Sequence, residues 1–482
     1  PPYPILSGLV GSEMCIRDRN NNSEQIHFIG ICGTAMGSVA AALQNRGYIV
    51  TGSDQNVYPP MSDFLIENGI SVSVGHNENN IPDNVDLVII GNAMSRGNVE
   101  VESVLNRKIP YTSLPELIKR YFLQGKRNIV ITGTHGKTTT SSIIAHILND
   151  NGLNPNLMIG GIPLDIGKGG RFTDSEFFVI EGDEYDTAFF DKRSKFVHYM
   201  PEIVVVNNIE FDHADIFSNL EEIKLSFTRM LNIVPENGIV FVNGDDPHAV
   251  EVTQICRAPV IKVGTSDECD YKIENLKLES SNSFFSLKGN SYKLPMHGEF
   301  NVRNAAMAIA VSDFIKIDHK NVAQSLSNFS GIARRQELRG EINGIKIIDD
   351  FGHHPTAIAA TIKALKQRYP NSKIWAIFEP RSNTSRRNML QSELQDSLSI
   401  ADGVFISEVP NPEKVPDGEL LDVESVVKQL VSKGLQGFVG SSSDDIVNRL
   451  IPLTSSGDTI VVLSNGGFGG IHDKLLKALK DK

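Results

Sequence analysis

Short apolar runs recur along the whole chain, and most of them end in a glycine-rich or polar segment. The main runs cover residues 25–29, 48–51, 85–90, 129–131, 177–180, 203–206, 345–348, 374–378, 403–406 and 459–463. Several are followed by helical spacing of apolar residues, as in the alanine-rich stretch that ends at Leu43. Strands that alternate with helices indicate parallel sheets, which bind ligands at the carboxyl ends of their strands. The pattern therefore predicts an α/β fold with candidate sites in those polar segments.

The first apolar run leads into the glycine loop Gly30-Ile-Cys-Gly-Thr-Ala-Met-Gly, and the second ends at Asp54. A strand, a glycine loop, a helix, a strand and an acid in this order are typical of a dinucleotide-like fold. Cys32 occupies the second glycine position of G-x-G-x-x-G, so a fold of this type without a ligand stays open. Asp54 could receive a ribose hydroxyl or could be an ordinary strand-end cap.

A phosphate loop is the strongest motif in the chain. Residues 129–140 read Ile-Val-Ile-Thr-Gly-Thr-His-Gly-Lys-Thr-Thr-Thr, and helical spacing follows. The loop departs from G-x-x-x-x-G-K-[ST], because Ile131 stands at the first glycine position. Backbone N–H groups and the helix dipole favour an anion here, while Lys137 can reach the β/γ-phosphates and Thr138 can offer Mg²⁺ a hydroxyl. The alternative is an ordinary strand–turn–helix corner with an exposed lysine.

Two acidic clusters follow the next strands of the same region. Residues 181–186 read Glu-Gly-Asp-Glu-Tyr-Asp, and residues 207–215 end in Asp212-His-Ala-Asp215. Parallel strands bring these ends to one edge of the sheet. Glu181 is the first metal candidate, because Mg²⁺ needs only one or two carboxylates beside phosphates. His213 could complete a second Mg²⁺ or Mn²⁺ site. A solvated acidic loop and a structural histidine are the alternatives.

Later polar segments extend the pattern to a third α/β region. Asn301 and Asn304 share one helix face, where their amides could read a nucleobase or ribose, although an N-cap asparagine is the alternative. The run 345–348 ends in Asp349-Asp-Phe-Gly-His-His-Pro355, and the run 374–378 is followed by Glu379-Pro-Arg-Ser-Asn-Thr384.

Composition restricts the function classes. The chain has 482 residues, which suggests about three domains, and its net charge of −12 argues against general nucleic-acid or anionic-membrane binding. No apolar run is long enough to span a bilayer. The four cysteines, at positions 15, 32, 256 and 269, lack zinc-ligand spacing and suit a reducing cytoplasm.

The predicted domain boundaries follow from these segments. The first 19 residues do not begin with Met, lack a secretory pattern and resemble translated adapter or vector sequence. We therefore expect residues 1–23 to be a non-native or disordered leader. Domains are predicted over 24–124, 125–332 and 333–482, with a linker at Gln124-Gly-Lys-Arg.

Together these motifs resemble the Mur ligase family from about residue 24 to the C-terminus. The resemblance rests on residues 30–37, 133–139, 181–186, 208–215, 298–304, 335 and 349–355. It implies a Rossmann-like UDP-substrate domain, a central P-loop ATPase domain, and a Rossmann-like C-terminal domain that binds the amine acceptor and moves to close the site. Several relatives carry a carbamoylated lysine after the His213 motif, but no counterpart is identified in this sequence. Lys224 lies nearby, and we expect it to be a helix-surface lysine.

The resemblance also implies a reaction. A carboxylate of the UDP-substrate is activated by ATP and Mg²⁺ as an acyl phosphate, and an amine then attacks it. Residues 181–196, 211–217, 379–384 and 464–470 resemble the branch that joins UDP-N-acetylmuramate to the recycled tripeptide L-alanyl-γ-D-glutamyl-meso-diaminopimelate. The alternative acceptor is free L-alanine, and the non-enzyme alternative is a UDP-sugar sensor on the same fold. We expect a cytoplasmic monomer or weak homodimer without nucleic-acid or membrane partners.

Site residues carry over from the family motifs as expectations. The ATP residues are Gly133, Thr134, His135, Gly136, Lys137, Thr138, Thr139, Asn301, Asn304, Arg335 and Asp350. The UDP-substrate residues are Gly30, Gly33, Thr34, Ala35, Met36, Asp54, Asn92, Ala93 and Asn98. The acceptor residues are Arg381, Ser382, Asn383 and Thr384, and the metal ligands are Thr138, Glu181 and His213. The catalytic residues are Lys137, Glu181, His213, Arg335 and His353.

Overall fold

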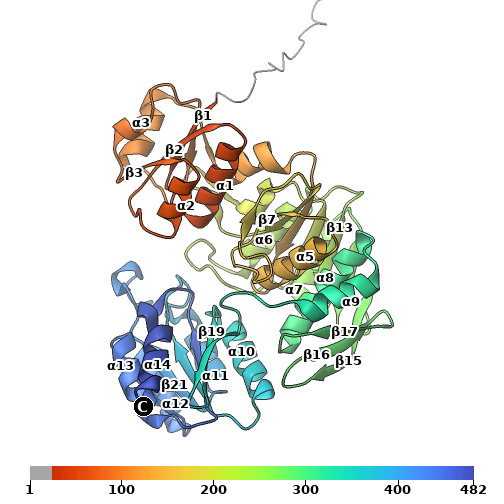
Figure 1. Ribbon diagram of the computed structural model, residues 1–482, viewed down its shortest axis with the longest axis vertical. Helices are drawn as coiled ribbons and strands as arrows, with labels where there is room; N and C mark the ends of the chain where they lie inside the picture. Colours follow the sequence, from red (N-terminus) through yellow and green to blue (C-terminus); the bar gives the residue numbers. More distant parts are fainter. Residues whose placement is uncertain (1–23) are drawn as a thin grey trace, which may run out of the picture. The chain divides into compact units, whose positions relative to one another are not determined.

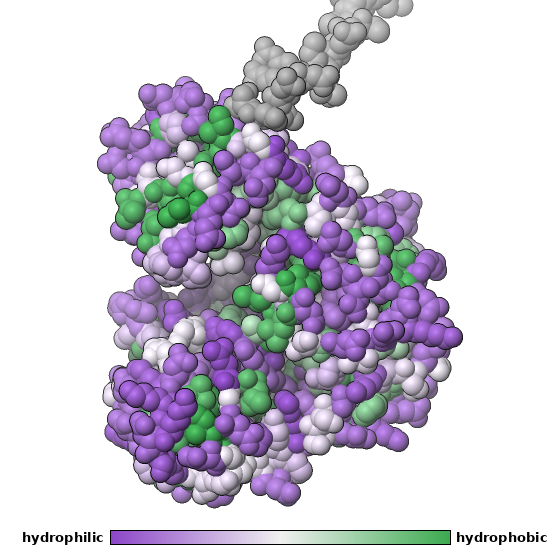
Figure 2. All heavy atoms as spheres, in the orientation of Figure 1, coloured by the Kyte–Doolittle hydropathy of each residue, from purple (hydrophilic) through white to green (hydrophobic). Residues whose placement is uncertain are grey.

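A computed structural model describes residues 24–482, and the predicted leader over residues 1–23 lies outside this range. The chain divides into two compact units, one ending at Leu114 and the other running from Pro115 to Lys482 (Figure 1). Hydrophilic residues predominate on the face drawn in Figure 2, in keeping with the net charge of −12.

The first unit is built on a parallel sheet with the strand order β3-β2-β1-β4-β5. Its strands are β1 (Gln25–Ile29), β2 (Ile49–Asp54), β3 (Ser71–Val74), β4 (Leu87–Ile90) and β5 (Tyr111–Ser113), and its helices are α1 (Thr34–Asn45), α2 (Met61–Glu67) and α3 (Val99–Arg107). The strand order reverses between β1 and β4, which is where open α/β sheets bind ligands. The predicted UDP-substrate residues largely follow these two strands.

A ten-stranded sheet forms the first half of the second unit, in the order β17-β16-β15-β14-β13-β12-β6-β9-β7-β8. Its parallel centre consists of β6 (Arg127–Thr132), β9 (Phe177–Glu181), β12 (Ile203–Val206), β13 (Ile239–Asn243) and β14 (Val260–Gly264). These strands are rich in buried Val and Ile, as expected for a sheet covered on both faces. The helices α5 (Lys137–Asp150), α8 (Glu299–Phe314) and α9 (His319–Asn328) pack together beside it.

The edges of this large sheet differ from its centre. The strands β15 (Tyr271–Leu278), β16 (Ser283–Leu287) and β17 (Asn290–Leu294) are antiparallel neighbours. At the other edge, β7 (Asn156–Met158) pairs with β8 (Gly170–Arg171). A hairpin of β10 (Asp186–Ala188) and β11 (Asp191–Ser194) stands apart from the sheet, and the helices α6 (Leu220–Leu231) and α7 (Pro247–Val252) complete this half.

The second half of this unit has a six-stranded sheet in the order β18-β19-β23-β20-β21-β22. The strands are β18 (Glu337–Ile342), β19 (Ile345–Asp350), β20 (Ile374–Phe378), β21 (Gly403–Ser407), β22 (Gln436–Gly440) and β23 (Thr459–Leu463). Apolar residues of α10 (Pro355–Arg368), α11 (Gln391–Leu398) and α12 (Val423–Ser432) form one core cluster. Those of α13 (Ser443–Leu450) and α14 (Ile471–Lys480) form another. Helices therefore cover both faces of the sheet, and the predicted α/β fold is confirmed.

A short helix, α4 (Leu114–Ile118), continues as a π-helical turn over Lys119–Leu123. The boundaries at 124 and 332 stay predictions. Among residues 24–482, every helix is too short or too polar to cross a membrane.

Candidate active site

The phosphate loop joins β6 to α5 and depends on two glycines. Gly133 has a φ of 124° and Gly136 has a φ of 81°, a region of backbone conformation that favours glycine. A Cβ at Gly136 would lie 2.5 Å from the Asn304 Oδ1 and 2.9 Å from the Asn207 Nδ2. Both the backbone conformation and the close packing therefore require glycine at position 136.

The turn after β12 holds the phosphate loop from one side. The Thr134 N–H donates to the Asn208 carbonyl at 3.0 Å, and the His135 N–H donates to the Asn208 Oδ1 at 2.7 Å. The helix α5 begins at Lys137 without a side-chain N-cap. Its first turn therefore presents backbone N–H groups and the positive end of the helix dipole, which suit a phosphate.

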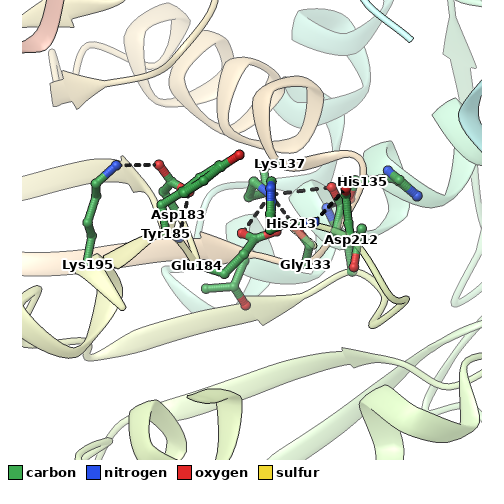
Figure 3. Close-up of polar contacts among 12 residues, drawn as sticks. Gly133, His135, Lys137, Asp183, Glu184, Tyr185, Lys195, Asp212 and His213 are labelled. Carbon is green, nitrogen blue, oxygen red and sulfur yellow. Dashed lines mark hydrogen bonds and ion pairs between the residues drawn. The ribbon is translucent and has the colours of Figure 1, made fainter. Parts of the chain in front are cut away.

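Lys137 lies in a buried cluster of charges (Figure 3). Its Nζ donates to the Gly133 carbonyl at 2.6 Å and to the Glu184 Oε2 at 2.9 Å. His213 lies on the same carboxylate, with its Nε2 3.0 Å from the Glu184 Oε1. Burial lowers the pKa of Lys137, but Glu184 and the neighbouring carboxylates outweigh it, so the net shift of this pKa is upward. Lys137 is therefore a charged ammonium.

Glu181 and Thr138 form a second group at the loop. The Thr138 hydroxyl acts to lower the pKa of Glu181, whose Oε1 accepts from the Gly160 N–H at 2.8 Å. Burial raises the pKa of Glu181, against the opposing effect of Lys137 and Arg335. The Arg335 Nη2 lies 3.3 Å from the Thr138 Oγ1. A carboxylate beside a hydroxyl is an oxygen donor set that fits Mg²⁺. His213, the third predicted metal ligand, instead contacts Glu184.

The predicted acceptor loop lies on the turn that carries His213. The Thr384 Oγ1 donates to the Asp212 Oδ1 at 2.7 Å and accepts from the Ala214 N–H at 3.3 Å. The Asn383 Nδ2 donates to the Asp215 Oδ2 at 2.8 Å. His213 itself has a φ of 55°. Its strained turn is therefore held by side chains from the loop after β20.

The other two predicted acceptor residues make no hydrogen bond to the His213 turn among the described residues, and the Arg381 side chain packs against Gly466. The Arg381 Nη1 lies 4.0 Å from the Glu379 Oε1, and the Arg381 side chain is half exposed. The Ser382 Oγ donates to the Ser385 Oγ at 2.9 Å.

The segment after β19 adds a histidine and a buried carboxyl group. Burial lowers the pKa of His353 although Asp212 opposes the shift, so its imidazole is neutral at pH 7. Asp350 accepts backbone N–H bonds from Gln336 at 2.9 Å and from Gly352 at 2.8 Å. Burial raises the pKa of Asp350. The Arg335 guanidinium lies 4.8 Å from the centre of the Phe351 ring, which positions this arginine.

Both predicted adenine-reading asparagines lie on α8 and are buried. The Asn304 Oδ1 accepts from the Thr140 Oγ1 at 3.3 Å, so this residue supports the phosphate loop from behind. The Asn301 Nδ2 donates to the His297 carbonyl at 2.8 Å. The Asn301 Oδ1 is buried and has no hydrogen-bond partner among residues 24–482. This acceptor is therefore free to bind a donor.

In the first unit, the glycine loop is fixed by β2. The Gly30 and Ile31 N–H groups both donate to the Ser53 carbonyl. The Asp54 Oδ2 accepts from the Cys32 N–H at 2.9 Å, and its Oδ1 accepts from the Asn56 N–H at 2.9 Å. Asp54 therefore caps the loop, and its predicted role toward a ribose hydroxyl stays a prediction.

The other predicted UDP-substrate residues differ in exposure. Exposed residues include Gly33, Thr34, Ala35, Asn92 and Ala93, whereas Met36 is buried. The Asn98 Oδ1 accepts from the N–H groups of Glu100 and Val101 and thus caps α3.

Family models cover most of the chain. The model described as "Mur ligase family, catalytic domain" matches residues 25–125, "Mur ligase middle domain" matches residues 131–312, and "Mur ligase, glutamate ligase domain" matches residues 334–466. The chain belongs to the Mur ligase family. Mur ligases are ATP-dependent amide-bond-forming enzymes, so this chain is an enzyme of that type.

Individual relatives of this Mur ligase match nearly end to end. The UDP-N-acetylmuramate–L-alanyl-γ-D-glutamyl-meso-2,6-diaminoheptandioate ligase of Escherichia coli is 41% identical over 95% of this chain and 99% of its own. A UDP-N-acetylmuramate–L-alanine ligase of Clostridium acetobutylicum is 34% identical over 95% and 98%. The crystal structure of a murein peptide ligase from Psychrobacter arcticus has 36% identity and a TM-score of 0.69, covering 95% of this chain and 99% of that chain.

Two buried acids of this Mur ligase, Glu184 and Glu100, were not singled out by the sequence. Glu184 belongs to the acidic run, but the run alone does not indicate which acid contacts Lys137. Glu100 is fully buried and bonds to the Ser53 Oγ at 2.5 Å and the Asn80 Nδ2 at 2.6 Å. Its place after an N-cap asparagine is typical of an exposed residue.

The expectation that Lys224 is a plain surface lysine is wrong. Lys224 is only 8% exposed. Its Nζ forms ion pairs with the Glu221 Oε1 at 3.0 Å and the Glu251 Oε2 at 2.9 Å. The pairing partner Glu251 comes from α7, which the local sequence around Lys224 does not indicate.

Proposed function

We propose that this Mur ligase joins UDP-N-acetylmuramate to the tripeptide L-alanyl-γ-D-glutamyl-meso-diaminopimelate in peptidoglycan recycling, with conversion of ATP to ADP and phosphate. The observation that carries this proposal is the 41% identity, over nearly the full length of both chains, to a ligase with that name. Addition of free L-alanine is the alternative, supported by the 34% identity to an L-alanine ligase. An intact set of Lys137, Thr138 and Glu181 argues against a UDP-sugar sensor.

The proposed roles of the domains follow the predicted boundaries. Residues 24–124 bind the UDP-substrate through the loops after β1 and β4. Residues 125–332 bind ATP through the phosphate loop. Residues 333–482 bind the amine acceptor. Given ATP and a UDP-sugar as substrates, we place the enzyme in the cytoplasm as a monomer or weak homodimer.

Charge placement supports the ATP assignment. Lys137 is a buried ammonium at the end of the phosphate loop and is proposed to bind the γ-phosphate. Thr138 and Glu181 would hold Mg²⁺, with His213 as a third ligand, and the ion would neutralise charge on the transferred phosphoryl group. Arg335 lies next to Thr138 and adds a second positive charge on the phosphate side.

The nucleoside part of ATP is assigned to buried polar groups. The free Asn301 Oδ1 supports a role in binding the adenine amino group, and Asn304 fixes the phosphate loop next to it. Asp350 is proposed for the ribose.

The proposed reaction has two steps. An oxygen of the muramate lactyl carboxylate attacks the γ-phosphorus, the bond to the β-phosphate oxygen breaks, and ADP leaves. The L-alanine nitrogen of the tripeptide then attacks the acyl carbon, and the C–O bond to phosphate breaks. The attacking ammonium must first lose a proton, which the neutral imidazole of His353 can accept. Residues 381–384 would position this amine, so catalysis is mainly positioning and charge stabilisation.

Substrate-dependent ADP release tests the proposal. Purified enzyme receives ATP, Mg²⁺ and UDP-N-acetylmuramate, first alone and then with the tripeptide, while ADP and the ligated product are both quantified. We expect ADP release in step with product and dependence on all three substrates. No ADP release with either the tripeptide or L-alanine would instead favour the sensor.

A further inference from the structure

Two histidines and a glutamate converge beside the phosphate loop, at a point that none of the proposed Mg²⁺ ligands occupies. His135 comes from the phosphate loop, Glu210 from the segment after β12, and His354 from the N-cap of α10. One possible ligand atom of each residue lies within 4.8 Å of those of the other two. We infer that His135, Glu210 and His354 form a binding site for a zinc-class ion, separate from the Mg²⁺ ligands Thr138 and Glu181.

The distances support metal ligation. The His135 Nε2 lies 3.4 Å from the Glu210 Oε2, and the His354 Nδ1 lies 3.6 Å from the same oxygen. In a tetrahedral zinc site with metal–ligand bonds of about 2.0–2.2 Å, neighbouring ligand atoms are about 3.4 Å apart. The two nitrogens therefore already lie near the required spacing from the carboxylate oxygen.

The hydrogen bonds place the lone pair of His354 on Nδ1, the nitrogen nearest Glu210. Its present partner is the weak N-cap bond from the Thr356 N–H, which a bound ion would replace. The Thr356 N–H points at the His354 Nδ1 over a long 3.4 Å, so this nitrogen carries a lone pair. The His354 Nε2 then carries the proton and donates it to the Phe211 carbonyl at 3.2 Å. A backbone carbonyl that accepts from the far nitrogen is the usual second contact of a zinc-bound histidine. The His135 Nε2 is buried and makes no hydrogen bond within residues 24–482.

Charge states also suit a cation. Burial lowers the pKa of His354 to about 4, so this ligand is neutral at pH 7. Burial alone would raise the pKa of Glu210, but His135, Thr356 and His354 bring it down to about 2. Two imidazoles and a carboxylate are the ligand types of many zinc sites that keep a fourth position for water. Imidazole nitrogens are common ligands of Zn²⁺, whereas Mg²⁺ prefers oxygen ligands.

A bound ion would join the two halves of the second unit. His135 and Glu210 belong to the half with the large sheet, and His354 belongs to the half with the six-stranded sheet. An ion held by all three would therefore tie the phosphate loop to α10 and stabilise this arrangement, because binding only to the folded form raises the melting temperature.

Binding of Co²⁺ and Zn²⁺ to the full-length protein tests the site. Titrations are run in excess Mg²⁺ and without nucleotide, with the visible absorption of Co²⁺ and the melting temperature in Zn²⁺ as readouts. Glu210→Gln keeps the size of the side chain but removes its charge, and His354→Ala removes a ligand. His319→Ala, in an exposed position on α9, is the matched control.

We expect wild type and His319→Ala to give tetrahedral Co²⁺ absorption and a zinc-dependent rise in melting temperature. Both site variants should bind at least about 10-fold more weakly and lose the rise. Equal binding by all four proteins, or none by the wild type, would overturn the inference. If His354→Ala fails to fold, Glu210→Gln alone decides the result.

Discussion

The Thr384 hydroxyl donates a 2.7 Å hydrogen bond to the Asp212 carboxylate and so joins the predicted acceptor loop to the turn that carries His213. Burial alone would raise the pKa of Asp212, but the neighbouring histidines and Thr384 lower it, so the acceptor is an ionised carboxylate. Hydrogen bonds to charged groups are worth about 1.5–3 kcal/mol. This hydroxyl, together with the Asn383–Asp215 bond, joins the proposed acceptor loop to the turn that carries His213.

Thr384→Val should remove this coupling with little change in volume. We expect kcat/KM for the tripeptide to fall by about 10- to 100-fold, the equivalent of the lost charged hydrogen bond. Steady-state kinetics measures the change, and Thr384→Ser, which keeps the hydroxyl, is the control. If the valine variant matches wild type, the hydroxyl does not position the His213 turn.

Lys137→Ala should stop turnover but leave UDP-substrate binding intact, because the glycine loop of the first unit does not involve Lys137. We expect the rate of ADP release to fall by at least about 10²-fold, because removal of one preorganised group that stabilises transition-state charge has an effect of this size. Calorimetry with UDP-N-acetylmuramate provides the binding measurement, and Lys320→Ala, at an exposed lysine, provides the control. Normal turnover without Lys137 would disprove the ATP-site assignment.

Gly136→Ala should destabilise the phosphate loop both by backbone strain and by a steric clash of the new Cβ. Its Cβ would lie 2.5 Å from the Asn304 Oδ1, whereas a Cβ at Gly152, with a similar φ of 77°, would meet open space. Gly152→Ala is therefore a matched control that costs only about 1–2 kcal/mol of backbone strain. We expect Gly136→Ala to lose more unfolding free energy in denaturant titrations and to bind ATP more weakly. Equal losses in the two variants would contradict the packing argument.

Acid should weaken the first unit through His27. This residue is fully buried, its Nδ1 lies 2.9 Å from the Thr51 Oγ1, and burial lowers its pKa from 6.5 to about 4. The unfolded chain binds the proton more readily, so stability falls as pH drops from 6.5 towards 4 and is unaffected by this group above 6.5. The full effect is about 3 kcal/mol.

Melting curves across this pH window check the prediction. His27→Gln removes the titrating group, so its melting temperature should fall less steeply with acid than that of wild type. His319→Gln, at an exposed histidine, should retain the wild-type slope. If the melting temperature of His27→Gln falls with pH as steeply as that of wild type, other groups cause the acid sensitivity.

Local motifs allowed much of the fold and part of the site to be predicted. The order strand, glycine loop and helix at residues 127–150 depends on neighbouring residues only, and so does the placement of Glu181 directly after β9. Contacts between distant segments were not predictable in the same way. Glu184 reaches Lys137 because of the turn after β9, and a run of acids does not specify which one turns inward.

The burial of charged residues was also not predictable from the sequence. Glu100 and Lys224 occupy positions that read as helix surface, but each is covered by groups from distant segments. Asp54 shows a milder form of this problem, since a strand-end acid can serve a ligand or its own loop, and here it accepts the Cys32 N–H. Pairing across the fold, which periodicity does not encode, decides such cases.

The most direct test of the account is a competition between acceptors. The enzyme is given UDP-N-acetylmuramate, ATP and Mg²⁺ with equal concentrations of tripeptide and L-alanine, and mass spectrometry measures the ratio of the two products. We expect UDP-N-acetylmuramyl-tripeptide to predominate. A predominance of UDP-N-acetylmuramyl-L-alanine would contradict the proposed acceptor and make this enzyme an L-alanine ligase.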